Sequence, residues 1–526
     1  MTSFIRQWTL RLISIALTAL YGAYRAHPAV WRLMARNYRP WMSRFARLHA
    51  WMTCQFAALD VPAYQRHLAA RGWRFRWFRL DSYPATDKEG YVRAYPEHER
   101  CWKGEVEIAG SVVDESSGSS GTPYNWVRSK RELDTVHRNV AGYTTLVFPS
   151  RRLFVVNAYS MGAWATGTNT GIAMARIATV KNTGPDLEKI VDTLRHFGPR
   201  YDYLVTAYPP FLKHLRDRLA GEQWFTEGGY RLAGMVGGEG MTEALRDYVG
   251  DVFGKVRSGY GASDLTIGMG GETTFTVWLR RLMRDDPEAR AALLGEDERR
   301  LPMVFQYNPL ETYLETTARG ELLCTINSTA VMAPKLRYNI GDEAALLDFP
   351  QVWEILTDLA ATRPGLLVAA ERAALRERMR LPLLFLYGRA DSTVSYMGAN
   401  IYPQDVEYGL YAGNPHAEHI EGFCLGLQDG LDARPVVHVQ LRANADADAA
   451  ADPAAGTVVD RDALAAVCRA GVLRHLATAS RDFAQSLTED DSAGELAVEI
   501  HAYGTGPFAG HHKIKNTYLV RHGKAA

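Results

Sequence analysis

The sequence predicts an α/β protein in which a large N-terminal domain is built on a mainly parallel sheet. Past residue 100, short apolar strands alternate with amphipathic helices, a pattern typical of parallel sheets covered by helices. Near residue 388 the composition changes, and shorter strands with a helix follow to the C-terminus. A chain of 526 residues is also too long for a single hydrophobic core. We therefore expect a large α/β domain followed by a small α+β domain.

The alternation is clearest between residues 150 and 260. Residues 153–156 form an apolar run that predicts a buried strand, and residues 203–205 predict another. Between them, apolar residues recur at i, i+3, i+4 and i+7 within 186–197, which predicts an amphipathic helix. Two prolines open a further predicted helix over 209–219. Residues 256–260 predict a strand that leads into a glycine-rich turn.

The overall composition is that of an ordinary folded protein. The chain is 47% hydrophobic and 23% charged, with a formal net charge of +1, so nothing in its charge argues for a nucleic-acid partner. The five cysteines are widely spaced and form no CxxC pair, which predicts a reducing compartment, buried thiols and no structural zinc. They are Cys54, Cys101, Cys324, Cys424 and Cys468.

The N-terminal 60 residues differ from this average. Residues 1–59 contain eight arginines, four tryptophans and no acidic residue. Polar residues at steps of four, three and four within 4–24 predict a helix with a narrow polar stripe. Such a helix is typical of membrane-interface binding, but it equally fits a helix that packs on its own domain. The uncharged run 12–24 is too short to span a bilayer.

A loop of small residues lies between two predicted strands, at 112–115 and 124–127. It consists of Ser116, Ser117, Gly118, Ser119, Ser120 and Gly121, followed by Thr122 and Pro123. Uncovered backbone amides and hydroxyl groups of this kind can converge on a phosphate, and glycines allow the positive φ angles that this requires. Ser-Gly repeats are also typical of flexible linkers. The residues of the loop alone leave both interpretations open.

Two glycine-containing segments follow predicted strands further along the chain, Gly237-Gly238-Glu239 and Tyr260-Gly261-Ala262-Ser263-Asp264. The C-terminal ends of parallel strands line a shared crevice. There Tyr260 offers a flat face for a base, and Asp264 offers a carboxylate for Mg²⁺. Asp342 follows a glycine turn and can accept two hydrogen bonds from vicinal hydroxyls, or it can cap its own loop.

Together with the segment 387–403, these loops occur in the order and at the spacing seen in the adenylate-forming superfamily of acyl-CoA synthetases. Residues 110–516 most resemble the phenylacetate-CoA ligase branch of that superfamily. The composition sets off an N-terminal cationic amphipathic helical segment over 1–60 and changes again near 388; with the resemblance, this implies a large adenylation domain over 61–388 and a small mobile domain over 389–526. The resemblance also implies that ATP, with Mg²⁺, activates a carboxylic acid to an acyl-adenylate, releasing pyrophosphate, and that the acyl group passes to CoA.

The resemblance assigns roles to the motif residues in turn. Residues 116–121 would hold the ATP phosphates, and Asp342 with Arg389 would hold the ribose. Asp391 would be the hinge of the small domain, and Gly398 would lie in the loop that serves the second half-reaction. The adenine would be bordered by Gly238, Glu239, Tyr260 and Gly261. In the C-terminal tail, the catalytic lysine would be Lys513, with Lys515 as the alternative.

Three departures from the family pattern affect these assignments. The lysine expected after the phosphate loop is Tyr124, so that contact is missing or comes from Arg128 or Lys130. The metal-binding glutamate is replaced by the shorter Asp264, which Glu272 could assist. The glycine before the catalytic lysine is a histidine.

The identity of the acid and of the acceptor is less constrained. We expect a lipophilic acid, fatty or aryl, in a pocket that includes Met161, Trp164 and Gly234. The acceptor is expected to be CoA, with an amine or a carrier-protein thiol as alternatives. A catalytically silent nucleotide-binding relative is a further alternative. Because the chemistry needs ATP, we expect a cytoplasmic protein, with peripheral membrane contact through residues 1–25.

Overall fold

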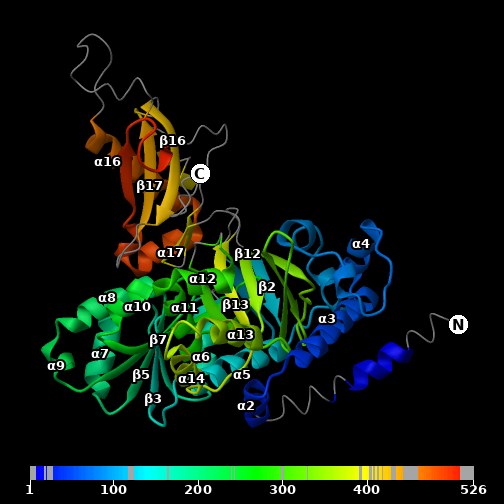
Figure 1. The fold of residues 1–526 in the computed structure, drawn as a ribbon. Coiled ribbons are helices and arrows are strands. Elements are labelled where there is room, and N and C mark those ends of the chain that lie inside the picture. The colour runs from blue at the N-terminus through cyan, green and yellow to red at the C-terminus, as the bar shows by residue number, and fades with distance from the viewer. Residues whose placement is uncertain are drawn as a thin grey trace.

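The structure is a computed structural model with a large part built on an eleven-stranded sheet and a small part built on a three-stranded sheet (Figure 1). It describes residues 8–16, 19, 28–116, 124–162, 165–238, 240–241, 243–296, 298, 301–328, 330–389, 394–397, 399–401, 405–406, 409–410, 414–416, 419–427, 434–441 and 460–509. The strand order in the large sheet is β10-β11-β12-β13-β9-β8-β7-β6-β5-β3-β4. The predicted α/β fold class is confirmed.

One half of the large sheet is parallel. Its strands are β3 (Leu153–Asn157), β4 (Thr179–Asn182), β5 (Asp202–Ala207), β6 (Arg231–Val236) and β7 (Phe253–Ala262). The helices between and beside them are α5 (Lys130–Val147), α6 (Ala165–Met174), α7 (Leu187–Phe197), α8 (Pro209–Ala220), α9 (Gln223–Thr226) and α10 (Glu243–Val249). Central residues such as Val155 and Leu204 are fully buried, as expected for parallel strands covered on both faces.

The helix α7 illustrates how the sequence sets these elements. The side chain of Asp186 accepts a hydrogen bond from the Lys189 amide and caps the N-terminus. Gly198 ends the helix with a φ of 68°, a conformation that favours glycine. Between the caps, Ile190 and Leu194 are buried against the sheet.

The other half of the large sheet is antiparallel, which corrects the expectation of a mainly parallel sheet. Its strands are β8 (Thr266–Gly271), β9 (Met303–Tyr307), β10 (Thr312–Thr316), β11 (Glu321–Ile326), β12 (Tyr338–Leu347) and β13 (Leu383–Arg389). Several are joined by turns too short for the crossover that parallel strands require, such as the turn between β7 and β8. The helices of this half are α11 (Thr274–Asp285), α12 (Pro287–Leu294), α13 (Phe349–Leu359) and α14 (Leu366–Ala374).

The N-terminal helices pack on the antiparallel half. They are α2 (Pro28–Arg36), α3 (Pro40–Asp60) and α4 (Pro62–Ala70), followed by the short helical turns η1 (Leu80–Ser82), η2 (Lys88–Val92), η3 (His98–Arg100) and η4 (Trp102–Gly104). Trp51 and Cys54 of α3 belong to the same buried cluster as Leu314 and Leu322. Residues 28–60 therefore share a core with the sheet, while the domain boundaries near 60 and 388 remain predictions.

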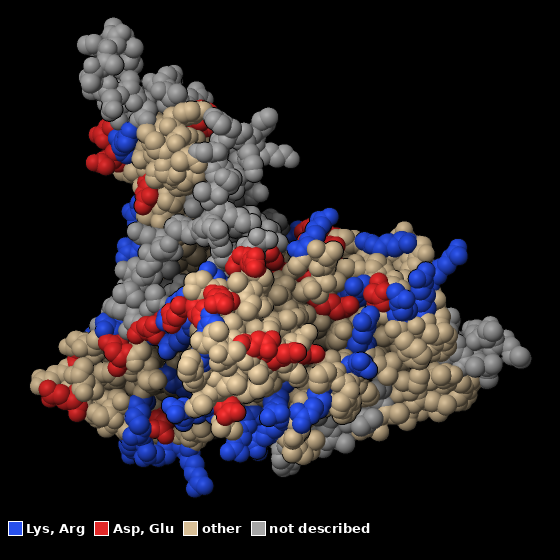
Figure 2. Space-filling model, in the orientation of Figure 1, with Lys and Arg blue, Asp and Glu red and all other residues tan. Residues whose placement is uncertain are grey.

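Residues 8–16 form a helical segment before α2. Leu10 is buried, whereas the side chains of Trp8, Leu12 and Ile15 are 51%, 64% and 67% exposed. None of the described helices is long and apolar enough to cross a bilayer. On the face shown in Figure 2, basic and acidic side chains are interspersed, with a run of basic ones along the lower edge.

The small part has its own hydrophobic cluster, drawn from residues between Val394 and Ile500. It contains the hairpin β14 (Val394–Tyr396) and β15 (Ala399–Ile401), the sheet β16 (Ile420–Leu427), β17 (Pro435–Leu441) and β18 (Ala497–His501), the helices α16 (Arg461–Ala479) and α17 (Arg481–Glu489), and the turns η6 (Asp491–Gly494) and η7 (Gly506–Phe508). This part stands above the large sheet in Figure 1. Ser160 donates a hydrogen bond to Glu489 and links the two parts.

All five cysteines are free and buried, as predicted. Burial raises the pKa of the Cys101 and Cys468 thiols to about 11 and that of Cys424 to about 12. It raises the pKa of Cys54 and Cys324 further. The thiols therefore stay protonated at neutral pH and pack as small apolar groups.

Candidate functional site

The two glycine-containing segments meet at one edge of the sheet. The first segment follows β6, and the second begins with the last three residues of β7; the two strands are parallel neighbours, with Val236 opposite Ser258. A cavity of about 180 Å³ lies there and is lined by Gly237, Gly238, Tyr260 and Gly261, among others. The crevice expected at the carboxyl ends of these strands is therefore present.

Two of these glycines are required by their surroundings. Gly238 has a φ of 85°, and a Cβ atom at this position would lie 2.9 Å from the ring of Tyr208. A Cβ atom at Gly261 would lie 2.7 Å from the Cα atom of Ile267. Larger residues would fill the cavity edge or displace β8, so the backbone here stays open to a ligand.

Tyr260 lines the cavity, and Asp342 lies directly behind its hydroxyl group. The Tyr260 hydroxyl donates a hydrogen bond of 2.5 Å to Asp342 Oδ2, and the tyrosine ring stacks on Phe305 with centroids 5.6 Å apart. In the register of β12 and β13, Asp342 is the direct partner of Arg389. Three residues predicted to contact the nucleoside thus come together from three strands.

The carboxylate of Asp264 already has two partners. Lys88 Nζ donates to Oδ1 over 3.3 Å, and the Tyr338 hydroxyl donates to Oδ2 over 2.8 Å. The carboxylate oxygens of Asp264 are ligands that suit Mg²⁺. An ion bound there would compete with the Lys88 ammonium for the carboxylate. Glu272, which could assist, is buried and accepts hydrogen bonds of 2.7 Å from Arg246 and from the Ser258 amide. Glu272 is therefore engaged in the core.

The loop 116–121 joins the two strands of one hairpin. β1 (Val112–Ser116) and β2 (Tyr124–Arg128) are antiparallel, with Ser116 opposite Tyr124. A linker between two domains would not be flanked by strands that pair with each other. Residues 117–121, together with the side chain of Ser116, lie outside the described part of the chain, so their phosphate contacts remain a prediction.

Arg128 anchors this hairpin, a role that sequence reasoning missed. Its guanidinium lies 3.5 Å from Asp114 of β1 and 2.9 Å from Glu132 of α5. It also donates to the carbonyl oxygens of Ser263 and Leu265, the latter over 2.5 Å. Burial raises the pKa of Asp114, while the arginine opposes that shift. Because Arg128 is committed to protein partners, Lys130 is the better candidate for the missing phosphate contact.

Lys335 is a second residue that the sequence did not single out. It is 4% exposed, and its ammonium lies 3.5 Å from the ring centroid of Trp126 in β2. Burial lowers the pKa of this lysine far below its usual value, and the charge of Arg128 adds to this effect. Asp264 favours its charged form. The Lys335 amine therefore packs on the Trp126 ring of the hairpin, and burial opposes its protonation while the Asp264 carboxylate favours it.

The walls of the cavity are mainly apolar. They include Tyr159, Met235, Val136 and Val140, and the N-terminal Trp31 closes part of one side. Of the described residues predicted for the acyl pocket, Met161 and Gly234 do not line this cavity. Gly234 faces α8, since a Cβ atom there would lie 2.7 Å from Leu212.

Several predicted site residues lie outside the described part of the chain. They are Trp164, Glu239, Asp391, Gly398, Lys513 and Lys515. The side chain of Arg389 also lies outside it. Their predicted roles stay predictions.

Comparison with solved structures gives a match over most of the chain. A structure of 2-hydroxyisobutyryl-CoA ligase, in complex with 2-HIB-AMP and CoA in the thioesterification state, aligns with 92% of this chain and 90% of that chain. The TM-score is 0.58 and the sequence identity is 14%. The chain has the two-domain adenylate-forming fold.

Other solved structures align less well. An open conformation of the same ligase covers 91% of this chain and 90% of its own, with a TM-score of 0.49 and 14% identity. The amide bond synthetase McbA from Marinactinospora thermotolerans covers 76% of this chain and 66% of its own, with a TM-score of 0.41 and 14% identity. Comparisons with protein-family models and with curated proteins give no match for this chain.

Proposed function

We propose that the protein activates a carboxylic acid with ATP, forming an acyl-adenylate and pyrophosphate, and then transfers the acyl group to the thiol of CoA. The observation that carries this proposal is the Tyr260–Asp342 hydrogen bond beside a glycine-lined cavity. The solved structure with the same fold contains 2-HIB-AMP and CoA. These are an adenylate and a thiol of the kinds proposed for this chain.

The nucleoside would bind where Tyr260 and Asp342 meet. Asp342 accepts hydrogen bonds from the ribose hydroxyls, and the Tyr260 hydroxyl orients its carboxylate. The adenine lies against Tyr260 and the uncovered backbone of Gly238 and Gly261. Arg389, the cross-strand partner of Asp342, completes the ribose contact.

The phosphates would be held by the amides of residues 116–121, at the end of the hairpin that Arg128 anchors. Adenylation brings a carboxylate to a phosphate, so positive charge must be in place beforehand. We assign that charge to Lys513, with the loop amides beside it. Asp264 would provide the oxygen ligand for Mg²⁺, which neutralises phosphate charge when bound; Lys88 would then release the carboxylate.

The acid would occupy the cavity between α5 and the ends of β3, β6 and β7. The apolar walls formed by Val136, Val140 and Met235 favour a lipophilic acid over a charged one. We propose a fatty or aryl acid of a size that suits a cavity of about 180 Å³. Met161, Trp164 and Gly234 are kept as pocket residues only if the acid extends beyond this cavity.

The alternative functions differ in the molecule that accepts the acyl group. CoA is our proposal, and an amine or a carrier-protein thiol would use the same adenylation step. A catalytically silent nucleotide-binding relative is a second candidate, and one observation favours it: both carboxylate oxygens of Asp264 accept hydrogen bonds from the protein. The same experiment separates all of these functions.

We also propose that the protein works in the cytoplasm, where ATP is available, with peripheral contact to a membrane. The exposed Trp8, Leu12 and Ile15 support this proposal, because such side chains insert at a lipid interface. Contact with a membrane would bring the protein close to lipophilic acids.

The test is pyrophosphate release with Mg·ATP across aryl, medium-chain and long-chain acids, with and without CoA. Acid-dependent release is expected, with faster turnover when CoA is present. Acid-dependent release without a CoA effect would redirect the search to amines and carrier proteins. No release with any acid, combined with nucleotide binding by calorimetry, would favour the silent relative.

Two matched lysine variants test the catalytic assignment. Lys513→Ala is expected to abolish acid-dependent pyrophosphate release, and Lys515→Ala is expected to retain it. The reverse result would move the role to Lys515. Circular dichroism of both variants checks that the fold is intact.

A further inference from the structure

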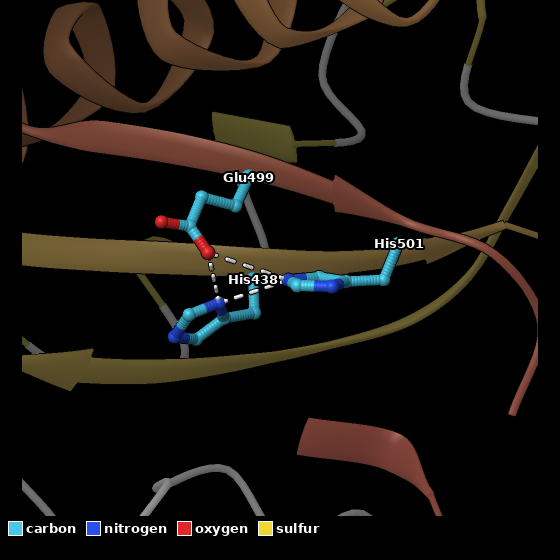
Figure 3. A group of neighbouring side chains, drawn as sticks. All are labelled: His438, Glu499 and His501. Carbon is cyan, nitrogen blue, oxygen red and sulfur yellow. Dashed lines mark hydrogen bonds and ion pairs between the residues drawn. The ribbon is translucent and has the colours of Figure 1, made fainter. Parts of the chain in front are cut away.

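Three side chains that the proposed reaction does not use converge on the small C-terminal sheet (Figure 3). His438 lies on β17, and Glu499 and His501 lie on the parallel neighbour β18. The register places His438 opposite Glu499 and Gln440 opposite His501. Because residues two apart on a strand share a face, all three side chains lie on the same side of the sheet.

The other side of this sheet is the one that packs against α16. Val437 and Val439 of β17 are buried in the cluster of the small part, with Val498 and Ile500 of β18 beside them. The histidine and glutamate side chains therefore occupy the face opposite the hydrophobic core. The side chains of His438 and His501 are 12% and 19% exposed, and that of Glu499 is 48% exposed, so the cluster opens to solvent on the glutamate side.

The distances between the donor atoms are close to those of a metal site. His438 Nδ1 lies 3.0 Å from His501 Nε2 and 3.2 Å from Glu499 Oε2, and His501 Nε2 lies 3.6 Å from the same oxygen. Ligands at 2.0–2.2 Å from a tetrahedral ion are separated by about 3.3–3.6 Å. The separations of 3.0 and 3.2 Å are a few tenths of an ångström shorter than these edges, and the two rings are hydrogen-bonded to each other here. A small outward shift of the rings would place the three atoms on one face of such a tetrahedron, and Figure 3 shows all three aimed at a common point.

The chain behind His501 holds its ring in this orientation. The turn η7 follows β18, and Gly506 in it has a φ of 59°. A Cβ atom at Gly506 would lie 2.5 Å from His501 Nδ1, so only glycine lets the turn close over the ring. The ring of Phe508 contacts the imidazole edge to face, with centroids 5.9 Å apart.

We propose that His438, Glu499 and His501 bind a divalent transition-metal ion, with Zn²⁺ the best fit. Two imidazoles and one carboxylate suit Zn²⁺ and similar ions, whereas Mg²⁺ and Ca²⁺ prefer all-oxygen ligands. Three protein ligands leave a fourth position to solvent or to a ligand. The ion would join β17 to β18 and stabilise the small sheet. The cysteine spacing predicted no structural zinc, but that argument does not reach a site built from histidines on two strands.

Cys424 lies close to these three residues, so its role as a possible fourth ligand has to be decided. This cysteine lies on β16 directly opposite His438, on the same face, but its thiol is not one of the three donor groups that converge within 4.8 Å of one another. We therefore assign the site to three residues and use Cys424→Ser as a test of that limit.

The experiment uses the full chain after treatment with a chelator. Calorimetry with Zn²⁺ is expected to give one equivalent bound, and Co²⁺ is expected to give the visible absorption of a four-coordinate ion. His501→Asn and Glu499→Gln are each expected to weaken Zn²⁺ binding more than about tenfold, since even outer-shell partners of a metal ligand contribute that much. Zn²⁺ should also raise the melting temperature of the wild type and not that of Glu499→Gln.

Two controls make the result decisive. His196→Asn removes an exposed histidine of α7 and, like Cys424→Ser, is expected to leave binding unchanged. Glu499 is the most exposed of the three ligands, so Glu499→Gln answers the question even if His501→Asn fails to fold. No binding by the wild type, or equal binding by Glu499→Gln, would overturn the proposal. Loss of binding in Cys424→Ser would overturn the three-residue assignment.

Discussion

At the scale of single residues, the Tyr260 hydroxyl makes the contact most directly tied to the proposed nucleotide site. It donates a hydrogen bond to Asp342, and hydrogen bonds to charged groups contribute about 1.5–3 kcal/mol. Tyr260→Phe keeps the ring that stacks on Phe305 but frees the carboxylate to turn. We expect the KM for ATP to rise about tenfold with little change in kcat.

Tyr203→Phe is the matched control for that measurement. The Tyr203 hydroxyl donates to the Gly198 carbonyl over 2.7 Å, away from the cavity, so the KM for ATP should stay at the wild-type value. A Tyr260→Phe enzyme with an unchanged KM would remove the tyrosine hydroxyl from the nucleoside site.

Lys335 gives a prediction about stability and pH. Burial lowers its pKa in the folded chain, whereas the unfolded chain titrates near 10.4. As the pH falls below about 10.4, the unfolded chain binds a proton that the folded chain does not, so folding loses stability until the folded pKa is reached. Lys335→Met removes this loss. We expect the variant to be more stable than the wild type at pH 7, with a smaller difference at pH 10.

Urea unfolding of both proteins at the two pH values measures this difference. Lys189→Met, at an exposed lysine of α7, should show no such dependence. A Lys335→Met protein that is less stable than the wild type at pH 7 would mean that the contact with Trp126 outweighs the cost of burial.

At the scale of elements, the hairpin β1–β2 depends on Arg128. Its guanidinium joins Asp114, Glu132 and two carbonyl oxygens, and removing one partner of a buried ion pair costs about 3–5 kcal/mol. We expect Arg128→Met to lower the free energy of unfolding by that amount. Arg128→Lys, which keeps the charge but not the fork of donors, should recover part of it.

Changes at Arg128 are also expected to affect catalysis, because of where the β1–β2 hairpin lies. Because its end is the predicted phosphate loop, Arg128→Lys is expected to slow pyrophosphate release more than its loss of stability explains. Arg176→Met removes a pair with Asp134 in which both side chains are exposed and should cost no more than about 1 kcal/mol. Wild-type turnover in Arg128→Lys would separate the hairpin from the phosphate site.

The helices and strands also show how much of the fold could be predicted from the sequence. The predicted segments at 153–156, 186–197 and 209–219 match β3, α7 and α8 to within a residue or two, since each has a strong local period or a proline start. The antiparallel half was not foreseen, because pairing between β9 and β13 depends on residues far apart in the chain. Local periodicity carries no information about such partners.

The same distinction applies to the candidate site. Tyr260 and Asp342 were predicted from short glycine motifs, Tyr260-Gly261 and Gly341-Asp342, which the structure places within β7 and β12. Lys335 was passed over and Arg128 was considered only as a phosphate contact, because a buried basic residue is indistinguishable from an exposed one until its distant partners are known. In the proposed metal site, Glu499 and His501 lie 61 and 63 positions after His438 in the sequence, so no spacing within one motif could indicate it.

At the scale of the whole molecule, the N-terminal helix is the feature that would place the enzyme at a surface. Leu12 and Ile15 are exposed apolar side chains beside the cationic residues of this segment. Burying each at a lipid interface is worth about 1.5–3 kcal/mol. We expect Leu12→Ser combined with Ile15→Ser to reduce flotation with anionic liposomes at least tenfold, and added salt to weaken binding of the wild type.

Val368→Ser is the control for this test. Val368 is 60% exposed on α14, away from the N-terminus, so its loss should not affect flotation. Equal flotation of the double variant and the wild type would assign the helix to packing within the protein.

The burial of all five thiols has a practical consequence for observing the two half-reactions. Maleimide dyes attack thiolates, and the native cysteines present none at neutral pH. Cysteines introduced by Leu375→Cys in the large part and Ala470→Cys on α16, both at exposed positions, would take up the dyes selectively. Energy transfer between a dye pair would then follow the small part during turnover, in a chain that keeps every native cysteine.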